Sequence, residues 1–452
     1  MFSKVLTLTA VILFFSTCEV QAEVIDSNWV GGKEGTWEDA SNWDPAIVPD
    51  NNATNTFNVK IAAVITDDDS IRIGLTQSHT INQLDCNVIG DDLNLEKWTS
   101  DRIELILDEP NGLTNYGLLE IDRIKICGDV NNVTGAWCYL DDLEIDGNLY
   151  NRVNAKLELE GDIEIEGDAV GGLNLENAGT IWMWGPGVQM YVEGTLHNVG
   201  QINLCAADCV ANRILNDSNG VIQGWGNLCT EDEGELLQNE GVIYASGGSL
   251  VITTENNAIS NNGTLGCEPG CFLHANPAFI EPGQEDVSNL EKIEVKGSGC
   301  VTFYCNLFNQ ANGEIELLGG TLAATTITQT ADANFVGFGG ITGDVVIEPN
   351  GIIKLTGPTN IVGDVNIPAG ATLEISDGQT LITGHTTCDG TIDLIGGSVI
   401  FQGGCDCNDC EINHTPGDYR NHFDINSDGI VNLRDFADFA ENWLWEANWF
   451  SE

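Results

Sequence analysis

The stretch LELEGDIEIEG, residues 157–167, decides the fold class. Apolar and acidic residues alternate strictly on both sides of Gly161, which predicts β-strands with one buried and one solvated face. The runs at residues 315–318 and 372–375 are similar, and no helical period persists between residues 60 and 403. Glycine, often after asparagine, separates the runs. The sequence therefore predicts an all-β region over residues 61–403.

A repeat of about one solenoid coil runs through this region. Asparagine and glycine recur together, and the glycines Gly179, Gly200, Gly220, Gly241 and Gly263 are 20 to 22 residues apart. The period weakens between residues 267 and 291, where we expect an insertion, and it is uneven before residue 175. Helix-free repeats of this length predict a parallel β-helix, in which each coil adds one rung to a stacked sheet. An array of β-sandwiches built from hairpins is the alternative.

Three tryptophans stand close together before the repeats, in a segment predicted to cap the solenoid at residues 23–60. Trp29, Trp37 and Trp43 are followed by Pro45 and Pro49. This segment resembles the opening of β-strand-repeat surface proteins, including autotransporter-like passengers. Clustered indoles beside turn residues can cover the open end of a sheet stack, and we expect that role here. A platform of flat rings that stack on sugars is the alternative.

A calcium loop is predicted near the C-terminus, in DINSDGIVNLRD at residues 424–435. Calcium takes six to eight oxygen ligands, so alternate residues of a tight loop must point inward. Gly429 permits the sharp turn at the sixth position, and Ile430 offers its backbone carbonyl at the seventh. A plain Asp/Asn/Gly turn is the alternative. The predicted side-chain ligands are Asp424, Asn426, Asp428, Asn432 and Asp435.

The residues after this loop have the pattern of an amphipathic helix. Apolar residues recur three and four apart between Leu433 and Leu444, which predicts one apolar helical face. A loop and helix of this kind resemble one half of a type I dockerin, a calcium-dependent module that binds cohesins. The resemblance implies that Leu433 and Arg434 face a partner. A dockerin has two such segments, whereas the predicted module at residues 419–452 has one and follows a cysteine-rich linker at residues 404–418.

The composition excludes several classes of partner. Asp and Glu number 69 against 16 Lys and Arg, so the formal net charge is −53. Such a chain repels nucleic acid and anionic lipid. Hydrophobic residues make up 42% of the chain, which is too many for a disordered acidic tail.

The first 22 residues are predicted to be an export signal. Lys4 precedes an apolar stretch at residues 5–15, and Val20-Gln21-Ala22 has the small residues of a cleavage site. The apolar stretch is too short for a membrane span, and no later one reaches that length. We therefore expect a secreted or cell-surface protein without a transmembrane segment. Lipidation of Cys18 is the alternative.

Fourteen of the 15 cysteines lie beyond this signal. An even number in an exported chain predicts disulfides, although the sequence does not reveal their pairing. Zinc is the alternative, but only Cys407 and Cys410 have the spacing of a zinc-binding pair. The close groups are Cys205 with Cys209, Cys267 with Cys271, Cys300 with Cys305, and Cys405 with Cys407 and Cys410.

No motif in the sequence specifies an active site. The six histidines are scattered, and there is no nucleophile elbow, zinc-protease motif or phosphate loop. The sequence predicts an exported structural or adhesive β-helix, attached through its calcium module to a cohesin-like or cell-surface protein. A polysaccharide is a second candidate partner, within an extracellular assembly that handles such polymers. A pectate-lyase-like polysaccharide lyase or glycoside hydrolase with the same module is the alternative function.

Overall fold

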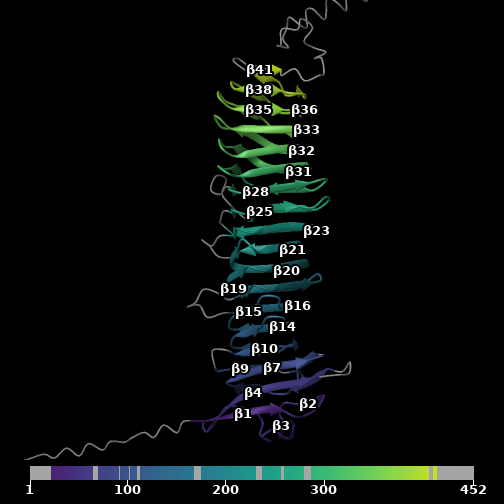
Figure 1. Ribbon diagram of the computed structural model, residues 1–452, viewed down its shortest axis with the longest axis vertical. Helices are drawn as coiled ribbons and strands as arrows, with labels where there is room; N and C mark the ends of the chain where they lie inside the picture. Colours follow the sequence, from purple (N-terminus) through teal and green to yellow (C-terminus); the bar gives the residue numbers. More distant parts are fainter. Residues whose placement is uncertain are drawn as a thin grey trace, which may run out of the picture.

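Parallel β-strands stack along one axis in the computed structural model, from β1 (Glu23–Trp29) at one end to β41 (Glu411–His414) at the other (Figure 1). The structure describes residues 22–64, 70–90, 92–100, 102–108, 112–166, 175–230, 237–255, 259–278, 287–406 and 411–414. Within these ranges, strand pairing is parallel except between β1 and β3 (Trp43–Asp44). The fold is an all-β parallel β-solenoid of about 15 turns. The predicted β-helix is thus confirmed, and the hairpin-based sandwich is wrong.

Each turn contributes to three faces, which we number by their order along the coil. Face 1 consists of β2 (Glu34–Thr36), β5 (Ile71–Leu75), β8 (Asp92–Lys97), β11 (Leu118–Asp122), β18 (Thr180–Trp184), β25 (Thr264–Cys267), β28 (Lys292–Lys296), β35 (Thr372–Ile375), β38 (Thr391–Leu394) and β41. Face 2 consists of β6 (His79–Ile81), β9 (Glu104–Leu107), β12 (Lys125–Cys127), β26 (Phe272–Ala278), β29 (Cys300–Phe303), β36 (Gln379–Ile382) and β39 (Ser398–Phe401).

Face 3 closes the coil. It consists of β1, β4 (Asn55–Val64), β7 (Gln83–Ile89), β10 (Leu113–Asn115), β13 (Val130–Asn132), β15 (Leu149–Asn151), β17 (Leu175–Asn177), β22 (Leu237–Asn239), β24 (Ile259–Asn261), β27 (Val287–Asn289), β30 (Leu307–Asn309), β34 (Val365–Ile367), β37 (Thr386–Cys388) and β40 (Cys405–Asp406).

Nine strands bend around corners and belong to more than one face. Faces 1 and 2 share β14 (Trp137–Asp146), β16 (Lys156–Ile165), β21 (Val221–Thr230), β23 (Val242–Glu255) and β33 (Ile352–Val362). Faces 2 and 3 share β19 (Gln189–Asn198). All three faces contain parts of β20 (Gln201–Asn216), β31 (Glu314–Gln329) and β32 (Asn334–Ile347).

Residues 157–165, from the alternating stretch LELEGDIEIEG, lie in β16 and explain one of these corners. Leu157, Leu159, Ile163 and Ile165 point inward, and the acidic residues between them point outward. Gly161 has a positive φ of 67°, and a Cβ there would come within 2.1 Å of the Asp142 side chain. The glycine therefore bends one continuous strand at the corner, where the sequence alone predicted a break between two strands.

The core is a set of apolar columns that run the length of the solenoid. On face 1, Ile181, Ile202, Ile222 and Ile243 stack in register and are fully buried. Alternate residues point to opposite sides of a strand, so each turn presents a matching apolar set to the turn above. Burial of these columns supplies the main stabilisation of the coil.

A ladder of buried amide side chains runs up the inside of face 3. Each ladder residue ends its face-3 segment, and the Nδ2 of each asparagine donates to the side-chain oxygen of the ladder residue one turn above, at 2.7–2.9 Å. Most of the same Nδ2 atoms also donate to a backbone carbonyl of a neighbouring turn. The members are Asn115, Asn132, Asn151, Asn177, Asn198, Asn216, Asn239, Asn261, Asn289, Asn309 and Gln329.

The ladder measures the length of each turn. Consecutive members are separated by 17 to 28 residues along the chain. The longest turn runs from Asn261 to Asn289 and covers the region where the sequence predicted an insertion. The separations of 17, 19 and 26 residues between Asn115 and Asn177 account for the uneven period before residue 175.

The N-terminal end is closed by the tryptophan cluster. Trp29, Trp37 and Trp43 are each at most 9% exposed. Trp43 packs edge-on against both other rings, with centroids 5.1 Å from Trp29 and 4.8 Å from Trp37. All three indole N–H groups donate to backbone carbonyls. Buried rings cannot form a sugar platform, so the structure places these residues in the core of the first turn.

The described residues contain one short 3-10 helix, η1 (Ala40–Asn42), and no α-helix. No described helix therefore has the length and apolarity that a membrane span requires. The solenoid is described as far as β41, and the predicted loop and helix of residues 419–452 lie outside the described residues.

We expect Asn198→Ala to lower the free energy of unfolding by about 2–4 kcal/mol, because Asn177 Nδ2 and Asn216 Oδ1 lose buried partners. Thermal and chemical denaturation followed by circular dichroism would measure the loss. Asn334→Ala is the matched control, because the Asn334 side chain is exposed at the start of β32, and its effect should stay within about 0.5 kcal/mol. Equal effects of the two substitutions would contradict a stabilising ladder.

Candidate functional site

Face 1 presents columns of outward side chains whose chemistry changes along the solenoid. Residues in register on successive turns lie above one another, about 4.8 Å apart. One such column, here called the outer column, follows the last outward position of the face-1 segments. It changes from carboxylates to tryptophans within one turn, because Leu159 pairs with Met183 and so brings Trp184 above Glu160. Its members in order are Glu96, Asp122, Asp141, Glu160, Trp184, Cys205 and Trp225.

Trp182, Trp184 and Trp225 form what we call the aromatic ridge. Trp182 and Trp184 flank the buried Met183 on β18, so both indoles project outward. Their rings stack with centroids 5.1 Å apart and planes 7° apart. Trp184 is 52% exposed and Trp225 is 41% exposed. Cys205 lies between these two in the column, so they stand two turns apart, roughly 10 Å.

Trp225 is held in place by two glycines on the next turn. A Cβ on Gly248 would lie 3.1 Å from Trp225 Cγ, and one on Gly247 would lie 3.4 Å from Cδ1. These glycines leave bare backbone that the indole covers, a common way for an aromatic ring to shield glycine in a sheet. The ring is thus supported from the next turn while much of it stays in contact with solvent.

Amide side chains lie beside the ridge in the adjacent column. Trp182, Asn203 and Gln223 are in register on three successive turns. Asn203 Oδ1 accepts hydrogen bonds from Gln201 Nε2 at 2.8 Å and from Gln223 Nε2 at 2.9 Å. Asn203 is 3% exposed, and it fixes the positions of the two glutamines around it. On the side of the amides, the surface next to the indoles is therefore polar, uncharged and ordered.

Below the ridge, the same face is a field of carboxylates. Burial and the neighbouring carboxylates of Asp92, Glu96 and Asp122 raise the pKa of Glu120. Burial and the charges of Asp142, Asp122 and Glu160 raise the pKa of Asp141 in the same way. Stacking like charges one rung apart disfavours their ionised form. At neutral pH, repulsion among these carboxylates therefore destabilises this part of face 1.

Face 2 contains a similar group of carboxylates around Lys125, and Arg102 also bonds to one of them, Glu144. The Lys125 ammonium donates to Glu144 and lies 3.7 Å from Asp146 and 3.9 Å from Glu166. The hydrogen bond to Glu144 raises the pKa of Lys125. Burial alone would raise the pKa of Glu144, but its hydrogen bond and charge interaction with Lys125 outweigh burial and lower that pKa. Lys125 thus offsets part of the repulsion among the three carboxylates and links neighbouring turns of the sheet.

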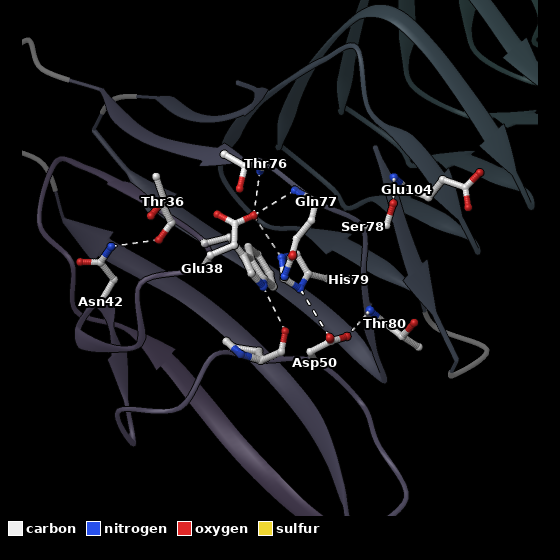
Figure 2. A network of polar contacts seen from close by, with 12 residues as sticks. Thr36, Glu38, Asn42, Asp50, Thr76, Gln77, Ser78, His79, Thr80 and Glu104 are labelled. Carbon is white, nitrogen blue, oxygen red and sulfur yellow. Dashed lines mark hydrogen bonds and ion pairs between the residues drawn. The ribbon is translucent and has the colours of Figure 1, made fainter. Parts of the chain in front are cut away.

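A polar network fastens the cap to the first coil (Figure 2). Glu38 Oε1 accepts hydrogen bonds from the backbone amides of Thr76 and Gln77 and lies 3.3 Å from His79 Nε2. His79 is buried, and its Nδ1 lies 3.9 Å from Asp50 Oδ2. Burial alone would raise the pKa of Glu38, but the hydrogen bonds from Thr76 and His79 lower it.

This network is a clamp and not a catalytic triad. The neighbouring hydroxyl of Ser78 accepts a hydrogen bond from the backbone amide of Glu104, away from His79. Asp50 accepts the backbone amide of Thr80. Each polar group thus ties one strand or loop of the first coils to another, which is a structural task.

A shallow hollow lies near the C-terminal end of the solenoid, lined by Asp344, Asp364 and His385. Asp344 Oδ1 accepts the backbone amide of Asp364, and Asp364 Oδ1 accepts that of His385. His385 Nε2 lies 3.3 Å from Asp406 Oδ2. The two carboxylates are therefore engaged in joining successive turns, and no observation on this hollow favours the lyase or hydrolase alternative.

The structure does not reach the residues predicted to bind calcium and a partner. Asp424, Asn426, Asp428, Ile430, Asn432 and Asp435, together with Leu433 and Arg434, lie outside the described residues. In the described part of the chain, no three His, Cys, Asp or Glu side chains are arranged to hold a metal ion. The calcium assignment stays a prediction from ligand spacing.

Most of the cysteines that the structure describes do not match the disulfide expectation. Cys205 and Cys209, and likewise Cys267 and Cys271, are unbridged thiols. Cys205 and Cys209 lie on a strand with a register shift between them, and Cys209 points into the core, where it packs as a small apolar side chain. Burial raises the pKa of Cys209, so its thiolate is disfavoured. Cys388 and Cys405, near the C-terminal end, each take part in a disulfide.

The sequence analysis missed the aromatic ridge and the amide ladder. The signal for the ridge is Trp182-Met183-Trp184, in which the largest side chains occupy outward positions of a strand. The signal for the ladder is the asparagine that ends each face-3 segment from β10 to β30, at positions that the sequence pattern places between strands. Trp225 has no such local signal, because its place above Trp184 depends on register across two turns.

Fold and surface together define a rod-like β-solenoid protein of the kind that presents a long outer surface. The family model that matches is the BigA fourth domain, over residues 98–342. This match covers more than half of the chain and includes the whole ridge, and the chain belongs to that family. No curated protein and no solved structure matches the chain.

The family match corrects the predicted identity. The sequence predicted a single type I dockerin-like module on an autotransporter-passenger-like protein, and this identification is wrong. The matching family is the BigA fourth domain, and the match lies in the solenoid. The short ligand pattern misled the assignment because it involves few residues and lacks the second copy that a dockerin has. The solenoid repeats carry the family relationship.

We expect Glu120→Gln to raise the midpoint of thermal unfolding at pH 7 by about 1 °C. A carboxyl whose pKa is raised by folding stabilises the protein below its ordinary value of 4.5, and this contribution is lost as the pH rises through the higher folded pKa. The gain should therefore shrink on acidification and vanish near pH 4.5. Scanning calorimetry from pH 4 to pH 8 would measure it. Glu348→Gln, in an exposed turn, is the control, and a gain at Glu120 that grows on acidification would contradict the assignment.

Proposed function

We propose that this protein is an adhesin-like cell-surface protein that uses face 1 for attachment. Membership of the BigA fourth-domain family supports this class of role. The observation that carries the proposal is the aromatic ridge, in which two tryptophans that stand two turns apart are 52% and 41% exposed on face 1. Large aromatic side chains are enriched at binding surfaces because they bury much area at little entropic cost. A rod that served only as a spacer would have no need of such rings.

The proposal includes export. The pattern at residues 1–22, a lysine followed by an apolar stretch and small residues, supports delivery across a membrane. The formal net charge of −53 keeps the rods soluble and apart through mutual repulsion, and it opposes contact with anionic surfaces. Attachment then depends on a local uncharged patch, which the ridge provides.

Expression of the full chain in bacterial cells tests this role. We expect antibody against the folded solenoid to label intact cells or the culture medium, and cells carrying the protein to adhere to a surface several-fold better than cells with an empty vector. Trp184→Ala together with Trp225→Ala should remove most of that gain at an unchanged surface level. A protein that is retained inside the cells, or adherence that is equal for both chains, would refute the proposal.

We propose separately that residues 424–435 bind one calcium ion. Five oxygen-bearing side chains at calcium-loop spacing and Gly429 at the turn support this assignment. The loop would then act as a local brace in calcium-rich surroundings, with Ile430 contributing only its backbone carbonyl.

Isothermal titration of the mature chain with calcium should show one saturable site that Asp424→Ala with Asp428→Ala removes. The comparison between variants matters because an acidic rod also attracts calcium weakly along its length. Asp377→Ala removes one charge at an exposed turn of the solenoid and should leave the saturable site unchanged. Identical titrations of the wild type and the double variant would contradict a calcium site here.

A further inference from the structure

The aromatic ridge has the chemistry of a site for sugars. We propose that Trp182, Trp184 and Trp225, with the neighbouring amides, bind an uncharged polysaccharide chain laid along face 1. This inference deepens the proposed attachment role and rests on it for its biological setting. It names the class of ligand that the surface fits.

The ridge offers the two kinds of contact that a sugar ring requires. The C–H faces of a pyranose ring are apolar and pack on indole rings, which combine a large apolar face with a polar edge. Its hydroxyls need hydrogen-bonding groups close by. Gln201 and Gln223, ordered by the buried Asn203, place amide groups next to Trp182 and Trp225. A purely apolar ligand would cover the other donors and acceptors of these amides, those not used in the bonds to Asn203, without pairing them.

The register of the solenoid favours a polymer over a single sugar. Trp184 and Trp225 stand two turns apart in one column, roughly 10 Å. Two rings at this separation along a straight line can contact alternate residues of one extended chain. Both rings are held by packing, Trp184 against Trp182 at 5.1 Å and Trp225 on Gly247 and Gly248. Preorganised rings lose little entropy on binding, which suits weak contacts that add along a polymer.

Charge selects the uncharged class of polymer. The residues of the ridge and its amides carry no formal charge, whereas Glu158 and Glu160 lie directly below the stacked pair. A polyanion laid on face 1 would meet these carboxylates and those of Glu120 and Asp141 further along the face, where the nearby Arg72 and Arg123 offset only part of the repulsion. Carboxylates accept hydrogen bonds from neutral hydroxyls, so a neutral chain is tolerated beyond the ridge.

Affinity electrophoresis of the mature full-length chain tests the ligand class. Gels would contain hydroxyethylcellulose, xyloglucan or galactomannan as uncharged probes, and polygalacturonate as the acidic probe. Pull-down on insoluble cellulose and chitin would extend the panel. We expect retardation or retention by at least one uncharged polymer and none by polygalacturonate. Wild-type protein that ignores every uncharged probe, or that binds polygalacturonate more tightly, overturns the inference.

Substitutions locate the site. Trp184→Ala with Trp225→Ala should weaken binding to the uncharged polymer at least tenfold. Trp98→Ala is the matched control, because Trp98 is 40% exposed and covers Gly74 much as Trp225 covers its glycines, yet it lies among the carboxylates. It should bind like the wild type. Equal weakening by Trp98→Ala, or none by the double variant, overturns the inference.

Two milder variants guard against misfolding. Trp184→Ala alone leaves Trp225 on its glycines, and Gln223→Ala alters one amide beside the ridge. Each should weaken polymer binding about threefold or more while circular dichroism and the unfolding midpoint stay near those of the wild type. Unchanged binding in both folded variants counts against the ridge as the site.

The outcome is separable from that of the attachment role. Cells that adhere through the ridge while no uncharged polymer binds would uphold the attachment role and overturn the ligand class. Polymer binding that depends on the ridge, in cells that do not display the protein, would uphold the ligand class and refute the surface role.

Discussion

The hydrogen bond from one ladder amide to the next is the interaction on which the rest of the structure depends. An amide buried in an apolar core is costly unless its donors and acceptors are paired. In this ladder each member from Asn132 to Asn309 accepts from the turn below and donates to the turn above, and a shift of one residue on either strand would break both bonds. Apolar columns alone tolerate small displacements, whereas the amide chain admits one register. From Asn115 to Gln329, the ladder thus fixes the register of face 3 from one turn to the next.

Register is what turns a repetitive sequence into a surface with distinct regions. Glu160 and Trp225 are far apart in the sequence, but they belong to one column of face 1 with Trp184 and Cys205 between them. The carboxylate part of face 1 disfavours its own ionisation, as the raised pKa values of Asp141 in this column and of Glu120 in the adjacent one indicate. The tryptophan part of the column carries no formal charge, and its indole rings are partly exposed to solvent. On face 1, a stretch of mutually repelling carboxylates therefore lies directly next to the aromatic ridge.

The sequence predicts the inside and outside of each strand well and their alignment poorly. Alternation in residues 157–167 correctly predicts which side chains of β16 are buried, because side-chain direction follows the pleat. Alignment between turns depends on turn length, which varies from 17 to 28 residues, so Trp184 and Trp225 could not be brought together by counting. The asparagines lie next to glycine, a pattern that indicates turns. The ladder is not visible in this local pattern, because each asparagine is paired with a residue of another coil. Cys205 and Cys209 are not bridged because a register shift between them leaves Cys205 on the outside and points Cys209 into the core.

The unequal turn lengths bear on how such a chain can diversify. Residues 152–176 and 262–288 each span a long coil, and yet the flanking asparagines hydrogen-bond at 2.8 and 2.9 Å, as in the short coils. Extra residues are therefore absorbed between the strands without displacing any column. Mutation can therefore lengthen, shorten or replace the extra residues of one coil at a time, while the strands of the three faces keep their register. The solenoid thus combines strands whose register is fixed by hydrogen bonds with connections whose length can change between coils.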